Sequence, residues 1–175
     1  MKPIVFLLFS CLFIAACGGP KAFYDYDESM NFAQCKTFSF YDNQQTGLNE
    51  LDQERLFNAL TSQLISKGLT PSESADFKIN ITTDVFQERN NNTSVGIGIG
   101  GGSGGFGGGV SGGIPINSQQ TILEITIDFA NSVNNELFWQ AVVEDNLPRE
   151  TTPEERTEIF NEMIAEALEN FPPEK

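Results

Sequence analysis

The chain of 175 residues has the length of one domain, and its ten basic and 24 acidic residues give a net charge of −14. Such an acidic surface repels nucleic acid, so nucleic acid is excluded as a partner. The sequence contains no histidine, the commonest ligand of zinc, copper and haem sites. We therefore expect no metal ion and no other cofactor.

The first 16 residues have the pattern of a cleaved bacterial signal peptide. Basic Met1-Lys2 precedes an apolar run over residues 4–14, which is too short to cross a hydrocarbon core that takes about 20 residues. The run ends in Ile14-Ala15-Ala16-Cys17, which resembles the lipobox of bacterial lipoproteins. We expect cleavage between Ala16 and Cys17 and lipidation of the Cys17 thiol. An ordinary signal peptide with a chance cysteine is the alternative.

Lipidation of Cys17 predicts a membrane-anchored protein of the cell envelope. Each buried methylene of an acyl chain such as palmitate adds about 0.8 kcal/mol, so two or three chains anchor durably. Gly18 favours the periplasmic face of the outer membrane over retention in the inner membrane. Residues 17–22 form a tether of about 17 Å when extended, so the domain, residues 23–175, is expected close to the bilayer.

The first half of the domain predicts two short strands and a helix. Residues 23–26 and 36–41 have strand-like patterns, and the second alternates phenylalanine with polar residues. Asn49 can cap a helix in which leucine recurs at every fourth position, and Gly68 ends it. With Cys17 acylated, Cys35 has no partner for a disulfide, and we expect it to be a small buried hydrophobe.

The second half predicts three longer strands. Residues 77–85 and 123–129 alternate apolar and polar side chains, as do Leu137, Trp139 and the residues that follow to Val143. Asn134-Asn135 precedes the last of these strands and tolerates the positive φ of a tight hairpin turn. We expect Trp139 to be a core residue.

A second helix closes the domain. Thr152-Pro153-Glu154-Glu155 is a capping box with proline at the first helical position, and one apolar face continues to Phe171-Pro172-Pro173. Two helices with one-sided apolar stripes and several alternating strands predict an α+β fold. We expect a largely antiparallel sheet with both helices packed on one face.

A glycine-rich loop over residues 94–118 separates the two long strands, and residues 96–113 hold twelve glycines. We expect a hairpin-like excursion. Its lack of charge keeps two alternatives open, a self-association element and a loop that contacts the membrane. Gly100, Gly102 and Gly105 fit a dinucleotide-binding spacing, but they lack the strand–turn–helix context and a following lysine.

The sequence offers little for catalysis. Serine and cysteine hydrolases normally use histidine as their base, and the chain has none. Two groups of carboxylates could serve glycoside hydrolysis, Asp25 with Asp27 and Glu28, and Glu144 with Asp145. Such neighbours arise by chance among 24 acidic residues. We expect no enzyme, with a carboxylate-dependent hydrolase as the alternative.

Several short motifs occur together in one order. They are Tyr26-Asp27, Asn31-Phe32, Lys36-Thr37-Phe38 with Phe40, the glycine-rich middle, Trp139, Pro153-Glu154-Glu155-Arg156 and Phe171-Pro172-Pro173. In this order the chain resembles the domain-of-unknown-function 4136 family of bacterial lipoproteins, from which Cys35 departs where an aromatic residue often stands. The resemblance implies an envelope lipoprotein with an α+β domain and no established catalytic residues.

The leading hypothesis is a non-catalytic interaction or accessory module anchored in the envelope. It would meet an envelope protein, or a second copy of itself, through its sheet or its glycine-rich loop. An oligomerising or membrane-contacting module that uses residues 94–118 is the alternative.

Overall fold

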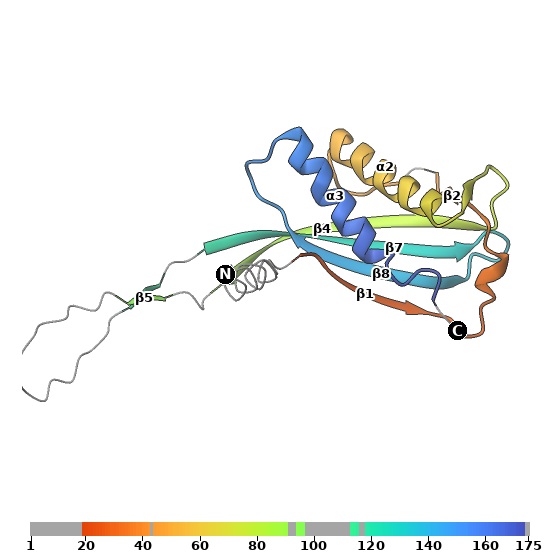
Figure 1. Ribbon diagram of the computed structural model, residues 1–175, viewed down its shortest axis with the longest axis horizontal. Helices are drawn as coiled ribbons and strands as arrows, with labels where there is room; N and C mark the ends of the chain where they lie inside the picture. The colour runs from red at the N-terminus through yellow and green to blue at the C-terminus, as the bar shows by residue number, and fades with distance from the viewer. Residues whose placement is uncertain (1–18, 43, 91–93, 97–112, 116–117, 174–175) are drawn as a thin grey trace, which may run out of the picture.

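The computed structural model describes residues 19–42, 44–90, 94–96, 113–115 and 118–173 (Figure 1). A six-stranded sheet has the spatial order β1-β8-β7-β4-β2-β3, and two helices lie together over one of its faces. The strands are β1 (Lys21–Tyr26), β2 (Thr37–Phe40), β3 (Thr70–Pro71), β4 (Phe77–Asn90), β7 (Ser118–Asn131) and β8 (Leu137–Asn146). The helices are α2 (Glu50–Ser66) and α3 (Pro153–Ala167).

The sheet is mixed, but most of its pairing is antiparallel. β1, β8, β7 and β4 pair antiparallel in that order, whereas β2 pairs parallel with β4 and with the short β3. The predicted α+β class with a largely antiparallel sheet is confirmed. The parallel pairing of β2 follows from α2, which crosses over the sheet between β2 and β4 and returns the chain in the same direction.

The hydrophobic core lies between the helices and the sheet face that they cover. Alternate residues of the central strands fill it, because successive side chains of a strand point to opposite faces. Its buried members include Phe77, Ile79 and Ile81 of β4, Leu123, Ile125, Ile127 and Phe129 of β7, Ala141 and Val143 of β8, Leu56, Leu60 and Leu64 of α2, and Phe160, Met163 and Ile164 of α3. No described helix is long and apolar enough to cross a membrane.

The hairpin between β7 and β8 corrects one detail of the predicted alternation. Asn135 has a φ of 56°, as expected for the tight turn, and the register shifts beside Phe129. This bulge turns both Phe138 and Trp139 into the core and leaves Leu137 53% exposed. Trp139 is therefore a core residue as predicted. The predicted alternation, which put Leu137 on the same apolar face as Trp139, was wrong.

Both helices begin as predicted. Asn49 Oδ1 accepts a hydrogen bond from the amide of Asp52, and Thr152 and Glu155 form the reciprocal bonds of a capping box. The spacing of Ile65 in the sequence also fits the apolar stripe of α2, but this residue is half exposed, so the buried stripe is narrower.

The glycine-rich loop enters and leaves through a second, two-stranded sheet. β5 (Ser94–Gly96) pairs antiparallel with β6 (Gly113–Pro115), which agrees with a hairpin-like excursion. The rest of the predicted loop, residues 97–112 and 116–117, lies outside the described residues.

Candidate functional site

The predicted lipidation site precedes the described part of the chain. Ala16 and Cys17 lie outside the described residues. β1 begins at Lys21, so only Gly18-Gly19-Pro20 separates Cys17 from the sheet. Four Cα steps span about 14 Å at most, which links the position of the cysteine closely to that of β1.

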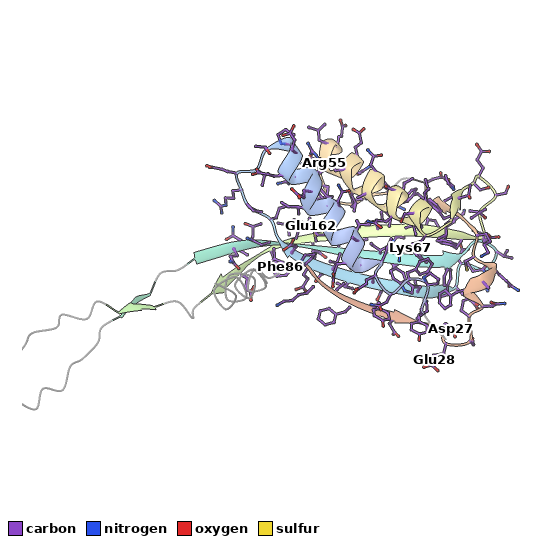
Figure 2. All side chains as sticks on the ribbon, in the orientation of Figure 1. Asp27, Glu28, Arg55, Lys67, Phe86 and Glu162 are labelled. Carbon is purple, nitrogen blue, oxygen red and sulfur yellow. The ribbon has the colours of Figure 1, made fainter. Side chains whose placement is uncertain are left out.

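In the first predicted group of carboxylates, Asp25 and Asp27 accept local hydrogen bonds. Asp25 Oδ1 accepts from the amide of Tyr26 at 2.9 Å, and Asp27 Oδ1 accepts from the amide and hydroxyl of Ser29 at 2.8 and 2.7 Å. The hydroxyl and amide of Ser29 hold the pKa of Asp27 below its ordinary value. A general acid needs a raised pKa, so the lowered pKa of Asp27 does not suit that role. The hydrogen bonds from Ser29 stabilise the turn that follows β1. Figure 2 shows Asp27 and Glu28 together beyond the end of β1.

The second predicted group is separated by the strand alternation. Glu144 and Asp145 are successive residues of β8, so their side chains point to opposite faces of the sheet. Glu144 instead lies opposite Glu124 of β7, which lies opposite Asp84 of β4. These three carboxylates form a row on the face away from the helices. The row depends on the register of three strands, so no local sequence pattern reveals it.

One carboxylate of the row, that of Glu124, has a raised pKa. Partial burial raises the pKa of Glu124, and the neighbouring carboxylates of Glu144 and Asp84 raise it further. Burial also raises the pKa of Asp145 on the other face. A hydrolase would need such a group inside a concave site. Among the best-formed hollows of the described residues, one is lined by Asp25 and Asp27, whereas none is lined by Glu124 or Asp145. Nor do these residues contain three acidic or cysteine side chains grouped to hold a metal ion.

The best-formed hollow, of about 330 Å³, lies beside the C-terminal end of α2. Its lining includes Phe32, Cys35, Leu69 and Phe171, with Lys67 also on its wall. Cys35 is buried as predicted, and burial followed by the charge of Asp76 raises the pKa of its thiol. A thiol with a raised pKa is a poor nucleophile, so Cys35 is a packing residue.

Two motifs that carried the family resemblance have structural roles. The Lys36-Thr37 pair starts β2, where Asp76 Oδ2 accepts hydrogen bonds from both amides and from the Thr37 hydroxyl at 2.8–2.9 Å. Arg156 of α3 reaches the carboxylate of Asp52, which is 2% exposed in the first turn of α2. These residues hold the elements together and leave the outer surface of the sheet as the candidate for function.

The free edge of the sheet, defined as Lys21–Asp25 of β1, exposes two aromatic side chains. On one side β1 pairs with β8, and no described strand pairs with its other side. The side chain of Phe23 is 67% exposed and that of Tyr24 is 45% exposed. Figure 1 shows β1 at the border of the sheet, with neither helix beyond it. An uncovered strand with exposed aromatic side chains is a ready site for pairing with another chain.

Two solved structures share the fold at low sequence identity. A PDZ domain protein from Parabacteroides distasonis is 15% identical with a TM-score of 0.51, and the match covers 98% of this chain. This chain spans only 40% of that protein. The PelC dodecamer from Paraburkholderia phytofirmans is 10% identical with a TM-score of 0.50, and the match covers 85% of this chain and 95% of PelC.

The sequence comparison identifies the family. No curated protein matches the chain. Residues 22–173 match the family described as Domain of unknown function (DUF4136), which extends over nearly all of the described residues. The matched range contains Asn31-Phe32 and Phe171-Pro172-Pro173, which line the hollow beside α2, and Arg156, which joins the two helices. The chain belongs to the DUF4136 family.

Proposed function

We propose that this protein is a lipid-anchored module of the bacterial cell envelope that binds another protein at the membrane surface and does not act as a catalyst. The observation that carries the proposal is the position of β1. This strand starts four residues after Cys17, and it is also the free edge that exposes Phe23 and Tyr24. A lipid on Cys17 would hold this edge within about 14 Å of the bilayer.

The membrane anchor rests on the lipobox and on the brevity of the tether. A diacylglyceryl group on Cys17, and a further acyl chain on the new N-terminus, would give durable attachment. Gly18 supports the periplasmic face of the outer membrane as the location. A partner must then come to the domain, because three intervening residues are too few for the domain to travel.

The proposal of a non-catalytic role is supported by the pKa of one acidic residue and the position of another. Asp27 has a lowered pKa, and Glu124 belongs to a carboxylate row on the uncovered sheet face. A carboxylate-dependent hydrolase remains the alternative in a different class. It would require an activity that disappears in both Glu124→Gln and Glu144→Gln, so a screen of glycoside substrates with these two variants tests it.

An oligomerising or membrane-contacting module is the second candidate, and one geometric relationship favours it. Lys21 is level with Asp84 across the sheet, and β4 continues six residues beyond Asp84, about 20 Å, towards the side from which the tether enters. Val85 and Phe86 are exposed on this projecting part, and Figure 2 shows Phe86 there. The formation of a dodecamer by PelC, which shares the fold, supports self-association as one form of binding.

The test uses the full chain in a Gram-negative host. The wild type should incorporate labelled palmitate and sediment with the outer membrane, whereas Cys17→Ala should do neither. Crosslinking in intact cells should then capture a defined species with the wild type and lose it with Cys17→Ala. A variant in which a short turn replaces residues 97–112 separates the two candidates. Loss of the captured species in this variant would transfer the binding role from the sheet to the glycine-rich loop.

A further inference from the structure

We propose that the partner at the free edge is a second copy of this chain, with the two β1 strands paired antiparallel and Phe23 opposite Phe23 across a twofold axis. This inference rests on the proposed function, because the anchor would hold both copies at one membrane surface. It adds the identity of the partner and the register of the contact. Observations on β1, on the opposite edge of the sheet and on the tether support it.

The backbone of β1 has free hydrogen-bonding groups on its outer side. The amide of Asp27 donates to the carbonyl of Phe138, and hydrogen-bonded positions alternate along an antiparallel pair. Lys21, Phe23 and Asp25 therefore bond to β8, while the amides and carbonyls of residues 22, 24 and 26 point outward. Of these outward amides, that of Tyr26 donates to Asp25 Oδ1, which leaves Ala22 and Tyr24 free to pair.

The faces of the sheet restrict the register. Tyr24 lies opposite the buried Ala141 and so points to the helix side, whereas Lys21, Phe23 and Asp25 point to the uncovered face. A continuous sheet must pair residues of the same face. Two centred registers satisfy this, one with Phe23 opposite Phe23 and one with Tyr24 opposite Tyr24.

Hydrogen bonds and charge select the first register. With Phe23 on the axis, Ala22 faces Tyr24 of the second copy, and the free amides and carbonyls of both residues form four hydrogen bonds. The same register sets Lys21 opposite Asp25 of the second copy, twice by symmetry. The second register sets Phe23 opposite Asp25 and needs the amide of Tyr26, which is already bonded.

The opposite edge of the sheet shows how an edge is normally protected. β3 has two residues and one of them is Pro71, which has no amide to donate. β1 has six residues and no proline, and its only lysine is the residue that the register pairs with an aspartate. Along β4, β2 pairs only with Phe77–Ile79, and Gln44 and Thr46 bond to the next part of that side of β4. Among the described strands, β1 is the border strand whose outer side is open over its whole length.

The pairing agrees with anchoring in a single leaflet. The twofold axis runs perpendicular to the sheet, so the two tethers leave in opposite directions along β1, with the two Lys21 residues about 14 Å apart. Both residues lie at the same height above a bilayer that is parallel to the sheet. Each tether reaches about 14 Å, and both lipids can therefore enter one bilayer surface. Two six-residue edges bury less area than a stable soluble dimer needs, so confinement to the membrane must supply the effective concentration.

The experiment introduces one cysteine at the predicted axis of the full, membrane-bound chain. In this register Phe23 forms a non-hydrogen-bonded pair, with Cα atoms about 4.5 Å apart, which suits a disulfide. Mild oxidation of Phe23→Cys in membranes should give a covalent dimer, at least tenfold above Val133→Cys. Val133 is the matched control, since it is 92% exposed in the turn between β7 and β8. Equal crosslinking of both variants would overturn the proposal.

Charge reversal tests the register independently. In the Phe23→Cys background, Lys21→Asp and Asp25→Lys should each reduce the dimer at least fivefold through like-charge pairs. Lys21 also lies opposite Glu144 of its own chain, so the decisive result is that the combination restores the dimer. Failure of the combination to restore the dimer would overturn this register. Palmitate labelling is measured on the same samples. A labelled, membrane-bound Phe23→Cys protein without dimer overturns the edge pairing alone, whereas an unlabelled protein overturns the anchoring on which both proposals rest.

Discussion

Arg156 of α3 donates two hydrogen bonds to the carboxylate of Asp52 in α2, from Nε to Oδ1 at 2.9 Å and from Nη2 to Oδ2 at 2.6 Å. Asn49 and Arg55 complete the shell around the same carboxylate. Burial alone would raise the pKa of Asp52, but Arg156, Asn49 and Arg55 outweigh burial and hold the pKa below its ordinary value. The cluster fixes the start of one helix against the first turn of the other.

Removing the guanidinium should destabilise the fold strongly. Arg156→Met leaves a buried carboxylate without its bidentate partner, and we expect the free energy of unfolding to fall by about 3 kcal/mol. Arg149→Met, in the exposed segment before α3, is the control and should change it by less than about 0.5 kcal/mol. Urea denaturation monitored by tryptophan fluorescence measures both. A loss of less than about 1 kcal/mol in Arg156→Met would show that the helices do not depend on this contact.

Asp76 makes a second junction, between the start of β2 and the start of β4. Its carboxylate accepts hydrogen bonds from the amides of Lys36 and Thr37 and from the Thr37 hydroxyl, and these bonds lower its pKa from the ordinary value of 3.8. We expect Asp76→Asn to cost about 1 kcal/mol at neutral pH, a modest value because the residue is exposed to solvent.

The cost should depend on pH with a definite sign. A carboxyl with a lowered pKa stabilises the fold above its unfolded-state value of 3.8, and this contribution is lost as the pH falls through the lowered native value. The difference in unfolding free energy between wild type and Asp76→Asn should therefore be constant above pH 5 and shrink below about pH 3.8. A difference that grows on acidification would contradict this role.

Local patterns made the elements of this fold predictable. The capping residues Asn49 and Thr152 gave the starts of both helices, and the alternation over residues 77–85 and 123–129 identified the central strands. Both strands extend further than predicted, because pairing between β4 and β7 continues where neither side chain pattern nor core burial requires it. Inter-strand hydrogen bonds sustain those residues, and such bonds leave little trace in a sequence.

The candidate sites were less predictable because they depend on register. Asp84, Glu124 and Glu144 are far apart in the sequence and become neighbours only when three strands are aligned. The pair Glu144 and Asp145, adjacent in the sequence, is divided between two faces by the same alternation that predicted the strand. The free edge at Phe23 could not be predicted from the sequence either, because a strand pattern does not indicate which strand lies at the border of a sheet.

For the carboxylate row we predict the opposite effect to that of Asp76, because the charged form of Glu124 destabilises the fold. Because the pKa of Glu124 is raised above its ordinary value of 4.5, its charged form destabilises the fold at neutral pH. Glu124→Gln should therefore stabilise the protein by about 0.5 kcal/mol at pH 7, or about 1–2 °C in Tm. The gain should disappear as the pH falls through the raised native value to the ordinary value of 4.5.

Glu162→Gln provides the matched control for Glu124→Gln. Glu162 is exposed on α3 (Figure 2), whereas the row lies on the sheet face that the helices leave uncovered, and its substitution should leave Tm within about 1 °C. Scanning calorimetry at pH 7 and pH 4 compares the two variants with the wild type. A lower Tm for Glu124→Gln at pH 7 would mean that the charge of Glu124 is stabilising, for example through a bound cation.

Trp139, the single tryptophan, packs between Phe129 and Phe171 with ring centroids 4.6 and 5.1 Å away. Its indole nitrogen is buried and has no hydrogen-bond partner among the described residues. Trp139→Phe should cost less than about 1.5 kcal/mol, because phenylalanine keeps the aromatic contacts and removes the unpaired donor, whereas Trp139→Ala should cost about 3–5 kcal/mol. Urea denaturation followed by circular dichroism measures both, since the fluorescent side chain is absent. Equal losses in the two variants would mean that a phenyl ring recovers none of the stability, so that packing specific to the larger indole ring accounts for the contribution of Trp139.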